Sequence, residues 1–145
     1  MKIAPADAAA LAERARTGYP LEVCGVLLGR PGPWRDGRGA LVLHCRAFPN
    51  REVAAPRARF EIAPEDLLEA QREAIAAGLE IVGYYHSHPD HPARPSETDR
   101  GQAAQGLSDG VLHVVIATDG RTAEATAWTF REASLAFVPE PFDVE

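Results

Sequence analysis

The sequence is poor in cysteine, in long apolar runs and in excess basic charge. Its two cysteines, Cys24 and Cys45, lie in separate apolar segments and form no CxxC pair, so they do not make a disulfide framework. We expect both to be small buried core residues, with a catalytic thiol as the sharper alternative. No apolar run approaches the ~20 residues needed to span a bilayer, and the first residues lack the order of a signal peptide. These absences predict a cytoplasmic protein.

A net charge of −6 argues against nucleic acid as the main partner, because phosphate binding needs a basic face. Arginines nevertheless crowd one region, at Arg46, Arg51, Arg57 and Arg59. This region is either a solvated loop or a local patch for an acidic protein partner. The 145 residues, of which 46% are hydrophobic and 25% charged, fit one domain over residues 1–145 with a real core.

Helical and strand patterns are mixed along the chain. The alanine-rich segment 5–16, the segment that begins at Pro64 and the segment that Ser96 can cap are expected to be helices. Strand patterns cover residues 23–28, 40–48, 60–62, 80–88, 113–118, 123–130 and 135–138. Hairpins across residues 30–39 and across Asp119-Gly120 would make antiparallel pairs. We therefore predict an α/β (α+β) fold, a mixed and largely antiparallel β-sheet flanked by helices.

The helix that begins at Pro64 is expected to end at Gly78. Its apolar residues, with alanines between them, are Leu67, Leu68, Ile75 and Leu79. We expect these four residues to form one buried stripe.

The segment from His86 to Asp99 combines residue types that bind metal. His86 and His88 are two apart in a strand pattern, so both imidazoles point to one face. Imidazole nitrogen is a good zinc ligand. The proline-rich loop 89–95 then turns the chain back and brings Asp99, on the first turn of the next helix, to the same place as an oxygen ligand. Three protein ligands leave a fourth position open, as a catalytic zinc requires.

Each half of this pattern has a simpler explanation. Two histidines on a strand can face solvent, and Ser96-x-x-Asp99 matches a capping box that stabilises a helix start. His, His, Ser and Asp at spacings of 2, 8 and 3 nevertheless seldom occur together by accident. The remaining histidines are expected to be structural or solvated rather than ligands; these are His44, His91 and His113.

The order H-x-H, seven residues, S-x-x-D resembles the JAMM motif of the MPN-plus metalloproteases. That family also has a glutamate upstream, and the segment YPLEVCGVLLG over residues 19–29 matches it at Glu22. The resemblance continues through residues 60–62, the helix after them and residues 81–89. It implies a cytidine-deaminase-like MPN/JAMM domain in which His86, His88 and Asp99 bind zinc.

The resemblance also implies that Glu22 and Ser96 are the catalytic residues. Glu22 would accept a proton from a zinc-activated water and later pass it to the leaving amine. The Ser96 hydroxyl would stabilise the oxyanion. Without the motif, Glu22 would be interpreted as a surface carboxylate at the start of a strand.

Members of this family cleave amide bonds after the C-terminal tail of ubiquitin or a ubiquitin-like protein. For prokaryotic relatives the resemblance implies a small sulfur-carrier protein of ubiquitin fold, from which a C-terminal residue or an attached cysteine is removed. The compact chain favours this substrate class over polyubiquitin, and a homo-oligomer is left open. A Gly-Gly tail can lie extended beside a strand edge, and the region 46–60 and the loop 89–95 are candidates for its channel.

Two other functions stay open. A non-catalytic MPN scaffold would lack metal, but scaffold members typically lose ligands that this chain keeps. A small-molecule zinc amidase would cleave acyl-amides without any protein partner. A cytidine-type deaminase is not indicated, because its P-C-x-x-C arrangement of cysteine ligands is absent.

Overall fold

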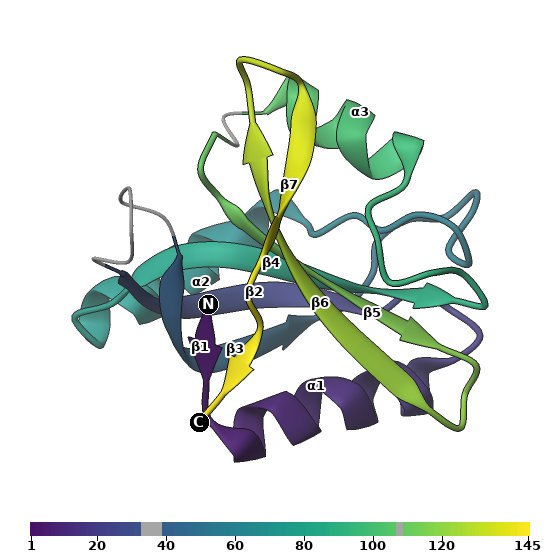
Figure 1. Ribbon diagram of the computed structural model, residues 1–145, viewed down its shortest axis with the longest axis horizontal. Helices are drawn as coiled ribbons and strands as arrows, with labels where there is room; N and C mark the ends of the chain where they lie inside the picture. Colours follow the sequence, from purple (N-terminus) through teal and green to yellow (C-terminus); the bar gives the residue numbers. More distant parts are fainter. Residues whose placement is uncertain (33–38, 107–108) are drawn as a thin grey trace.

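The computed structural model describes residues 1–32, 39–106 and 109–145. Its strands are β1 (Lys2–Ile3), β2 (Cys24–Pro31), β3 (Ala40–Phe48), β4 (Glu80–Pro89), β5 (Leu112–Thr118), β6 (Ala123–Arg131), β7 (Ala136–Glu140) and β8 (Asp143–Val144). Its helices are α1 (Pro5–Gly18), α2 (Pro64–Ala76) and α3 (Glu97–Gln105). Within these parts of the chain, the strands form an eight-stranded sheet in the order β7-β6-β5-β4-β2-β3-β1-β8 (Figure 1).

Most neighbouring strands of the sheet run antiparallel. β2 is antiparallel to both β3 and β4, and β6 is antiparallel to both β5 and β7. β4 and β5 are parallel, with α3 in the connection between them, and the short β1 runs parallel to β3 and β8. The predicted mixed, largely antiparallel sheet flanked by helices is confirmed. The loop expected over residues 30–39 lies mostly outside the described residues.

Alternation along the central strands divides the core into two layers. On β2, Leu27 packs in the layer that includes α1, whereas Val26 and Leu28 pack in the layer that includes α2. On β4, Tyr85 and Tyr84 divide in the same way, and Tyr85 is buried. The centre of the sheet is therefore covered on both faces, which gives the carboxyl end of β4 a rigid support.

The buried stripe expected for α2 is wrong for two of its four residues. Leu68 and Ile75 are 51% and 67% exposed, whereas Leu67 and Leu79 pack against the core beside the fully buried Ala70 and Ala74. These two alanines lie one turn apart on the face that packs against the sheet, where their small side chains let the helix approach closely. Helical periodicity showed that α2 has an apolar side, but it did not show which residues of the helix face the sheet.

The strand expected over residues 60–62 is also wrong, because this segment pairs with a loop instead of the sheet. The Glu61 N–H donates to the Asn50 side chain, and the Glu61 carbonyl accepts a hydrogen bond from the Arg51 N–H. β1 and β8 were missed, since two residues are too few to show an alternating pattern.

The helices begin and end as their sequences predict. α1 and α2 each begin with a proline in the first turn, where the missing N–H costs no hydrogen bond. Gly78, two residues past α2, has a φ of 68°, a conformation that favours glycine. No helix in the described ranges is long and apolar enough to cross a membrane. The cytoplasmic location and the single-domain organisation stay predictions.

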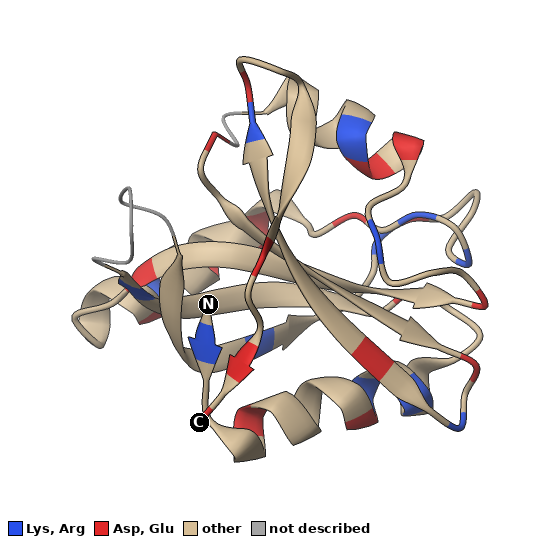
Figure 2. Ribbon diagram, in the orientation of Figure 1, with Lys and Arg blue, Asp and Glu red and all other residues tan. Residues whose placement is uncertain are grey.

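The arginine-rich region separates into two parts. The Arg46 guanidinium on β3 forms ion pairs with Glu69 and Glu73 of α2 at 3.2 and 3.0 Å, so it is already engaged. The other arginines of this region lie on the exposed loop between β3 and α2, at the right of Figure 2. A basic surface in this region is therefore confined to the loop.

The two cysteines are poorly suited to nucleophilic chemistry. Cys24 is buried and Cys45 is half-buried, and burial raises the pKa of each thiol to about 12. A thiol with such a pKa is protonated at neutral pH, whereas the nucleophile is the thiolate. The alternative of a catalytic thiol is not supported.

The packing of β2 predicts where the fold is most sensitive to truncation. We expect Leu27→Ala to lower the free energy of unfolding by about 2–5 kcal/mol, because Leu27 is fully buried and its loss leaves a cavity. The matched control is Leu68→Ala on the exposed face of α2, which should change stability by less than about 0.5 kcal/mol. Urea unfolding measures both, and equal effects would contradict the assigned core.

Candidate metal centre

Three side chains from β4 and α3 converge at the carboxyl end of β4. The Asp99 Oδ2 atom lies 3.1 Å from His86 Nε2 and 3.0 Å from His88 Nε2, and the two Nε2 atoms are 3.0 Å apart. All three residues are buried. In the described parts of the chain, they form the group of His, Cys, Asp and Glu side chains whose geometry could hold a metal ion.

Local rules of secondary structure bring these three side chains together. His86 and His88 share a face because β4 alternates, and β4 is held between β2 and β5. Asp99 lies in the first turn of α3, where the Ser96 Oγ accepts the Asp99 N–H and the Asp99 Oδ2 accepts the Ser96 N–H. Both hydrogen bonds of the capping box are present, and they also direct the Asp99 carboxylate toward the histidines.

The hydrogen-bond partners of His88 indicate which of its ring nitrogens carries a proton. His88 Nδ1 lies 2.9 Å from the Pro92 carbonyl oxygen, and only a protonated Nδ1 can donate to that acceptor. A neutral His88 then carries a lone pair on Nε2, directed at the carboxylate oxygen of Asp99. Two electron-pair donors at 3.0 Å repel unless a proton or a metal cation lies between them. The residues present therefore fit a cation.

The pKa values of the group point the same way. Burial alone would raise the pKa of Asp99, but the two imidazoles and the Ser96 N–H lower it well below its ordinary value. Burial alone would lower the pKa of His88, but the Asp99 carboxylate and the Pro92 carbonyl raise it. The pKa of His86 is lowered, mainly by burial. The carboxylate thus stays ionised, and positive charge is stabilised beside it.

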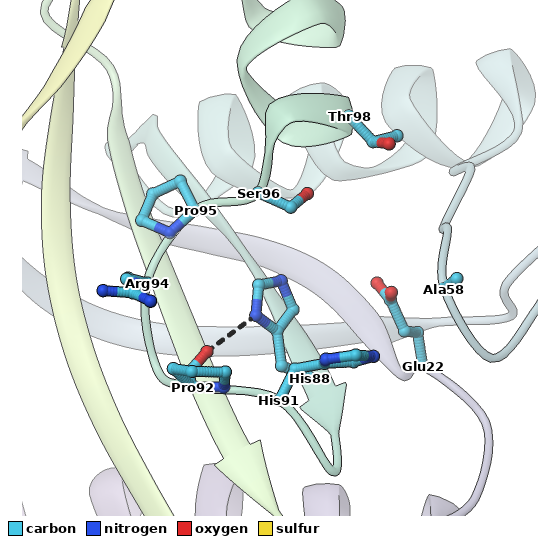
Figure 3. Close-up of a pocket in the computed structure, with 9 residues that line it drawn as sticks. All are labelled: Glu22, Ala58, His88, His91, Pro92, Arg94, Pro95, Ser96 and Thr98. Atoms are coloured by element: carbon cyan, nitrogen blue, oxygen red, sulfur yellow. Dashed lines mark hydrogen bonds between the residues drawn. The ribbon is translucent and has the colours of Figure 1, made fainter.

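Glu22 lies just before β2, on the other side of the opening from Ser96 (Figure 3). Its side chain is buried, and the Oε1 atom has no hydrogen-bond partner among the described residues. Burial raises the pKa of Glu22 to about 8, opposed by the charge of His88 and reinforced by that of Asp99. A carboxyl with a near-neutral pKa can both accept and release a proton at neutral pH.

Two cavities meet at the group. A cavity of about 300 Å³, shown in Figure 3, is lined by Glu22, Ala58, His88, His91, Pro92, Arg94, Pro95, Ser96 and Thr98. A second cavity of about 450 Å³ is lined by Phe60, Glu61, Ile62, Leu67, Tyr84, His86, Asp99, Gln102, Ala103, Gly106 and His113. The first contains both predicted catalytic residues, and the second borders His86 and Asp99.

The remaining histidines do not join the group. His44 is exposed on β3, and His91 is exposed at the smaller cavity. His113 lines the larger cavity with an Nε2 atom that has no partner among the described residues, and burial lowers its pKa to about 4. Among the described residues, the group that could hold a metal ion is made of His86, His88 and Asp99 and contains none of these three histidines.

Several supporting residues were not predicted, because their contacts come from distant parts of the chain. The Phe60 ring stacks on the His86 ring with centroids 4.5 Å apart. The Ser87 Oγ accepts the Val23 N–H, which joins the end of β4 to the start of β2. The Asn50 side chain donates to the Glu22 carbonyl oxygen. Polar residues beside a motif are the only sequence signal for such contacts, and that signal is weak.

The chain is similar to known proteins over most of its length. Residues 5–131 match the family model described as prokaryotic homologs of the JAB domain. A desampylase from Haloferax volcanii is 39% identical over 121 residues, which cover 81% of this chain and 78% of that protein. A desampylase from Pyrococcus furiosus is 40% identical over 79 residues, covering 54% and 49%.

A solved structure shows the same fold. The crystal structure of AF2198, a JAB1/MPN domain protein from Archaeoglobus fulgidus, matches with a TM-score of 0.58 at 21% identity and covers both chains completely. At this identity the likeness shows the fold alone, and it confirms the predicted MPN-type architecture. The chain therefore belongs to the family of prokaryotic homologs of the JAB domain and is a hydrolase of the JAMM type.

Proposed function

We propose that this protein is a zinc-dependent metallopeptidase or isopeptidase that hydrolyses the amide bond after the C-terminal tail of a ubiquitin-like or sulfur-carrier protein. The observation that carries the proposal is the buried group of His86, His88 and Asp99 with Glu22 across the opening. Family membership and the name of the two desampylase relatives support a substrate of this class.

The donor set favours zinc. Two imidazole nitrogens and one carboxylate oxygen are typical ligands of a catalytic zinc, which keeps a fourth position for water or substrate. When bound, zinc supplies a water of lowered pKa and polarises the substrate carbonyl. His86, His88 and Asp99 would hold it, and the Pro92 carbonyl would keep the His88 ring in the tautomer that offers Nε2.

The chain's own residues then account for the proton transfers. Glu22 takes a proton from the attacking water and delivers it to the leaving nitrogen, so the carbon–nitrogen bond breaks to give a free amine. The Ser96 Oγ accepts a hydrogen bond from the Asp99 N–H, which leaves its own O–H free to donate to the developing oxyanion. Burial of Glu22 keeps bulk water from competing for that proton.

The larger cavity suits the acyl side of the substrate. Its wall includes residues 60–62, which lie between the loop and α2, and Phe60, Ile62 and Tyr84 make this wall largely apolar. A glycine-rich tail could lie extended along this wall with its last carbonyl at the histidines. Of the two predicted channel segments, only the Phe60 end of the region 46–60 reaches this cavity, while the loop 89–95 lines the smaller one.

The ligand assignment predicts the metal content of two histidine variants. The wild type should contain about one zinc per chain, and His88→Ala should lose zinc and activity together, because three ligands hold a catalytic zinc. His91→Ala is the control, since His91 lines the same opening without joining the group. Elemental analysis measures the zinc content of each variant. Full zinc content in His88→Ala would show that His88 is not a ligand.

The role of Glu22 predicts a variant that separates metal binding from turnover. Glu22→Gln should keep zinc and lower kcat by about 10²–10⁴-fold, because it removes the proton acceptor and keeps the shape. Glu65→Gln, at an exposed position of α2, should leave both unchanged. Steady-state kinetics with zinc analysis measure the pair, and normal turnover in Glu22→Gln would eliminate it as the base.

The substrate class can be tested directly. Zinc-loaded protein should cleave the host's ubiquitin-like or sulfur-carrier proteins extended beyond Gly-Gly, and mass spectrometry should find the cut after the second glycine. A panel of small acyl-amides is the comparison. Rapid cleavage of the small amides with no cleavage of any extended carrier protein would favour the amidase alternative.

A further inference from the structure

The position of Glu22 assigns the two cavities to the two sides of the cleaved bond. Glu22 must lie beside the nitrogen that receives its proton, and Glu22 lines the 300 Å³ cavity but not the 450 Å³ one. The amine product therefore leaves through the smaller cavity. This step rests on the function proposed above.

Arg94 is the cationic side chain among the residues that line this smaller cavity. Its backbone is fixed, because the Arg94 N–H donates to the Pro92 carbonyl and Pro95 restricts the residue before it. The Thr126 hydroxyl on β6 donates to the carbonyl oxygen of Ala93, which ties the loop to the sheet. Arg94 therefore lines the cavity from a segment whose backbone is held, and its long side chain is exposed to solvent.

No carboxylate of the described residues forms an ion pair with Arg94. The contrast with other arginines is clear, since Arg46 and Arg100 each have acidic partners within 4 Å. Glu97, which lies in the chain between the lining residues Ser96 and Thr98, pairs with Arg100 at 2.9 Å. The Arg94 guanidinium therefore keeps its full capacity to bind an anion that enters the cavity.

The chemistry of the leaving group indicates which anion that is. A C-terminal amino acid that is joined through its α-nitrogen carries a free carboxylate two bonds from the cleaved nitrogen. A lysine joined through its side chain presents an uncharged alkyl segment at the same place. Guanidinium binds carboxylate through two parallel N–H donors, a geometry that a lysine alkyl segment cannot use.

We propose that Arg94 is a specificity-determining residue that binds the free α-carboxylate of a single amino acid released from the end of the tail. The preferred reaction is then the removal of one C-terminal residue in α-linkage, more than the cleavage of an isopeptide bond to another folded protein. The water adds its hydroxyl to the last tail carbonyl, and the amino acid leaves with the proton carried by Glu22.

The size of the cavity supports a small leaving group. Its volume of about 300 Å³ lies at the lower end of ligand pockets. Pro92 and Pro95 form part of its wall, so the wall cannot easily widen. A single residue fits these dimensions better than a segment of a folded protein.

The test compares two substrates that differ only in charge at the end. The ubiquitin-like protein cleaved in the substrate test is extended by one alanine and prepared with either a free carboxylate or a carboxamide. The wild type should prefer the carboxylate by about 10- to 100-fold in kcat/KM, the range expected for a charged hydrogen bond. Arg94→Gln should abolish most of this preference, and Arg94→Lys should restore part of it.

Controls separate recognition from a structural effect. Arg72→Gln, an equal loss of charge on the exposed surface of α2, should keep the wild-type preference. Zinc content should be equal in all variants. Equal rates on both substrates in the wild type, or an equal loss on both in Arg94→Gln, would overturn the assignment of Arg94.

A binding measurement keeps this assignment distinguishable from the proposed function. Zinc-loaded Glu22→Gln is titrated with a tail hexapeptide that ends in Gly-Gly-Ala, as free carboxylate and as carboxamide. Tighter binding of the carboxylate, lost in the Glu22→Gln, Arg94→Gln double variant, supports the assignment even if neither protein substrate is cleaved and the proposed function fails. Equal affinities for the two peptides reject it.

Discussion

Electron pairs of two imidazoles and a carboxylate are directed at one point inside the protein, and the surrounding structure holds them there. Such a convergence is unfavourable without a cation, because the donors repel and have lost most of their water. It persists since none of the three side chains can turn away: β4 fixes two of them in the middle of a sheet, and the capping box fixes the third. The site is therefore preorganised for positive charge.

The loop between β4 and α3 contacts both the candidate metal group and the smaller cavity. Its Pro92 carbonyl sets the tautomer of His88, and its Ser96 orients Asp99. The same loop forms the wall of the smaller cavity and carries Arg94. A displacement of the loop would change the ligands and the cavity together, so the prolines that stiffen it serve both purposes.

Local rules were sufficient to predict the positions of the metal group, but not its surroundings. Strand alternation placed His86 and His88 on one face, and the capping box placed Asp99 beside them, because both are properties of a few consecutive residues. The stacking of Phe60 on His86 depends on how a loop returns from β3, which no local pattern encodes. The buried face of α2 was predicted incorrectly in part for a similar reason. Ala70 and Ala74 let the helix pack closely on the sheet, but alanine is less hydrophobic than the neighbouring Leu68, which is exposed.

Two cavities of unequal size border the candidate metal group, and the proposed reaction uses them for different products. The larger cavity is lined in part by Phe60, Ile62 and Tyr84, whereas the smaller cavity contains Glu22, the proposed proton carrier, and Arg94 on the proline-rich loop. A nitrogen leaving into the smaller cavity meets the group that protonates it, and a carboxylate attached to that nitrogen meets Arg94. The acyl and amine products would therefore leave through different cavities. Because this asymmetry is built from the wall residues, a relative with the same metal ligands and another residue at the position of Arg94 can cleave a different bond.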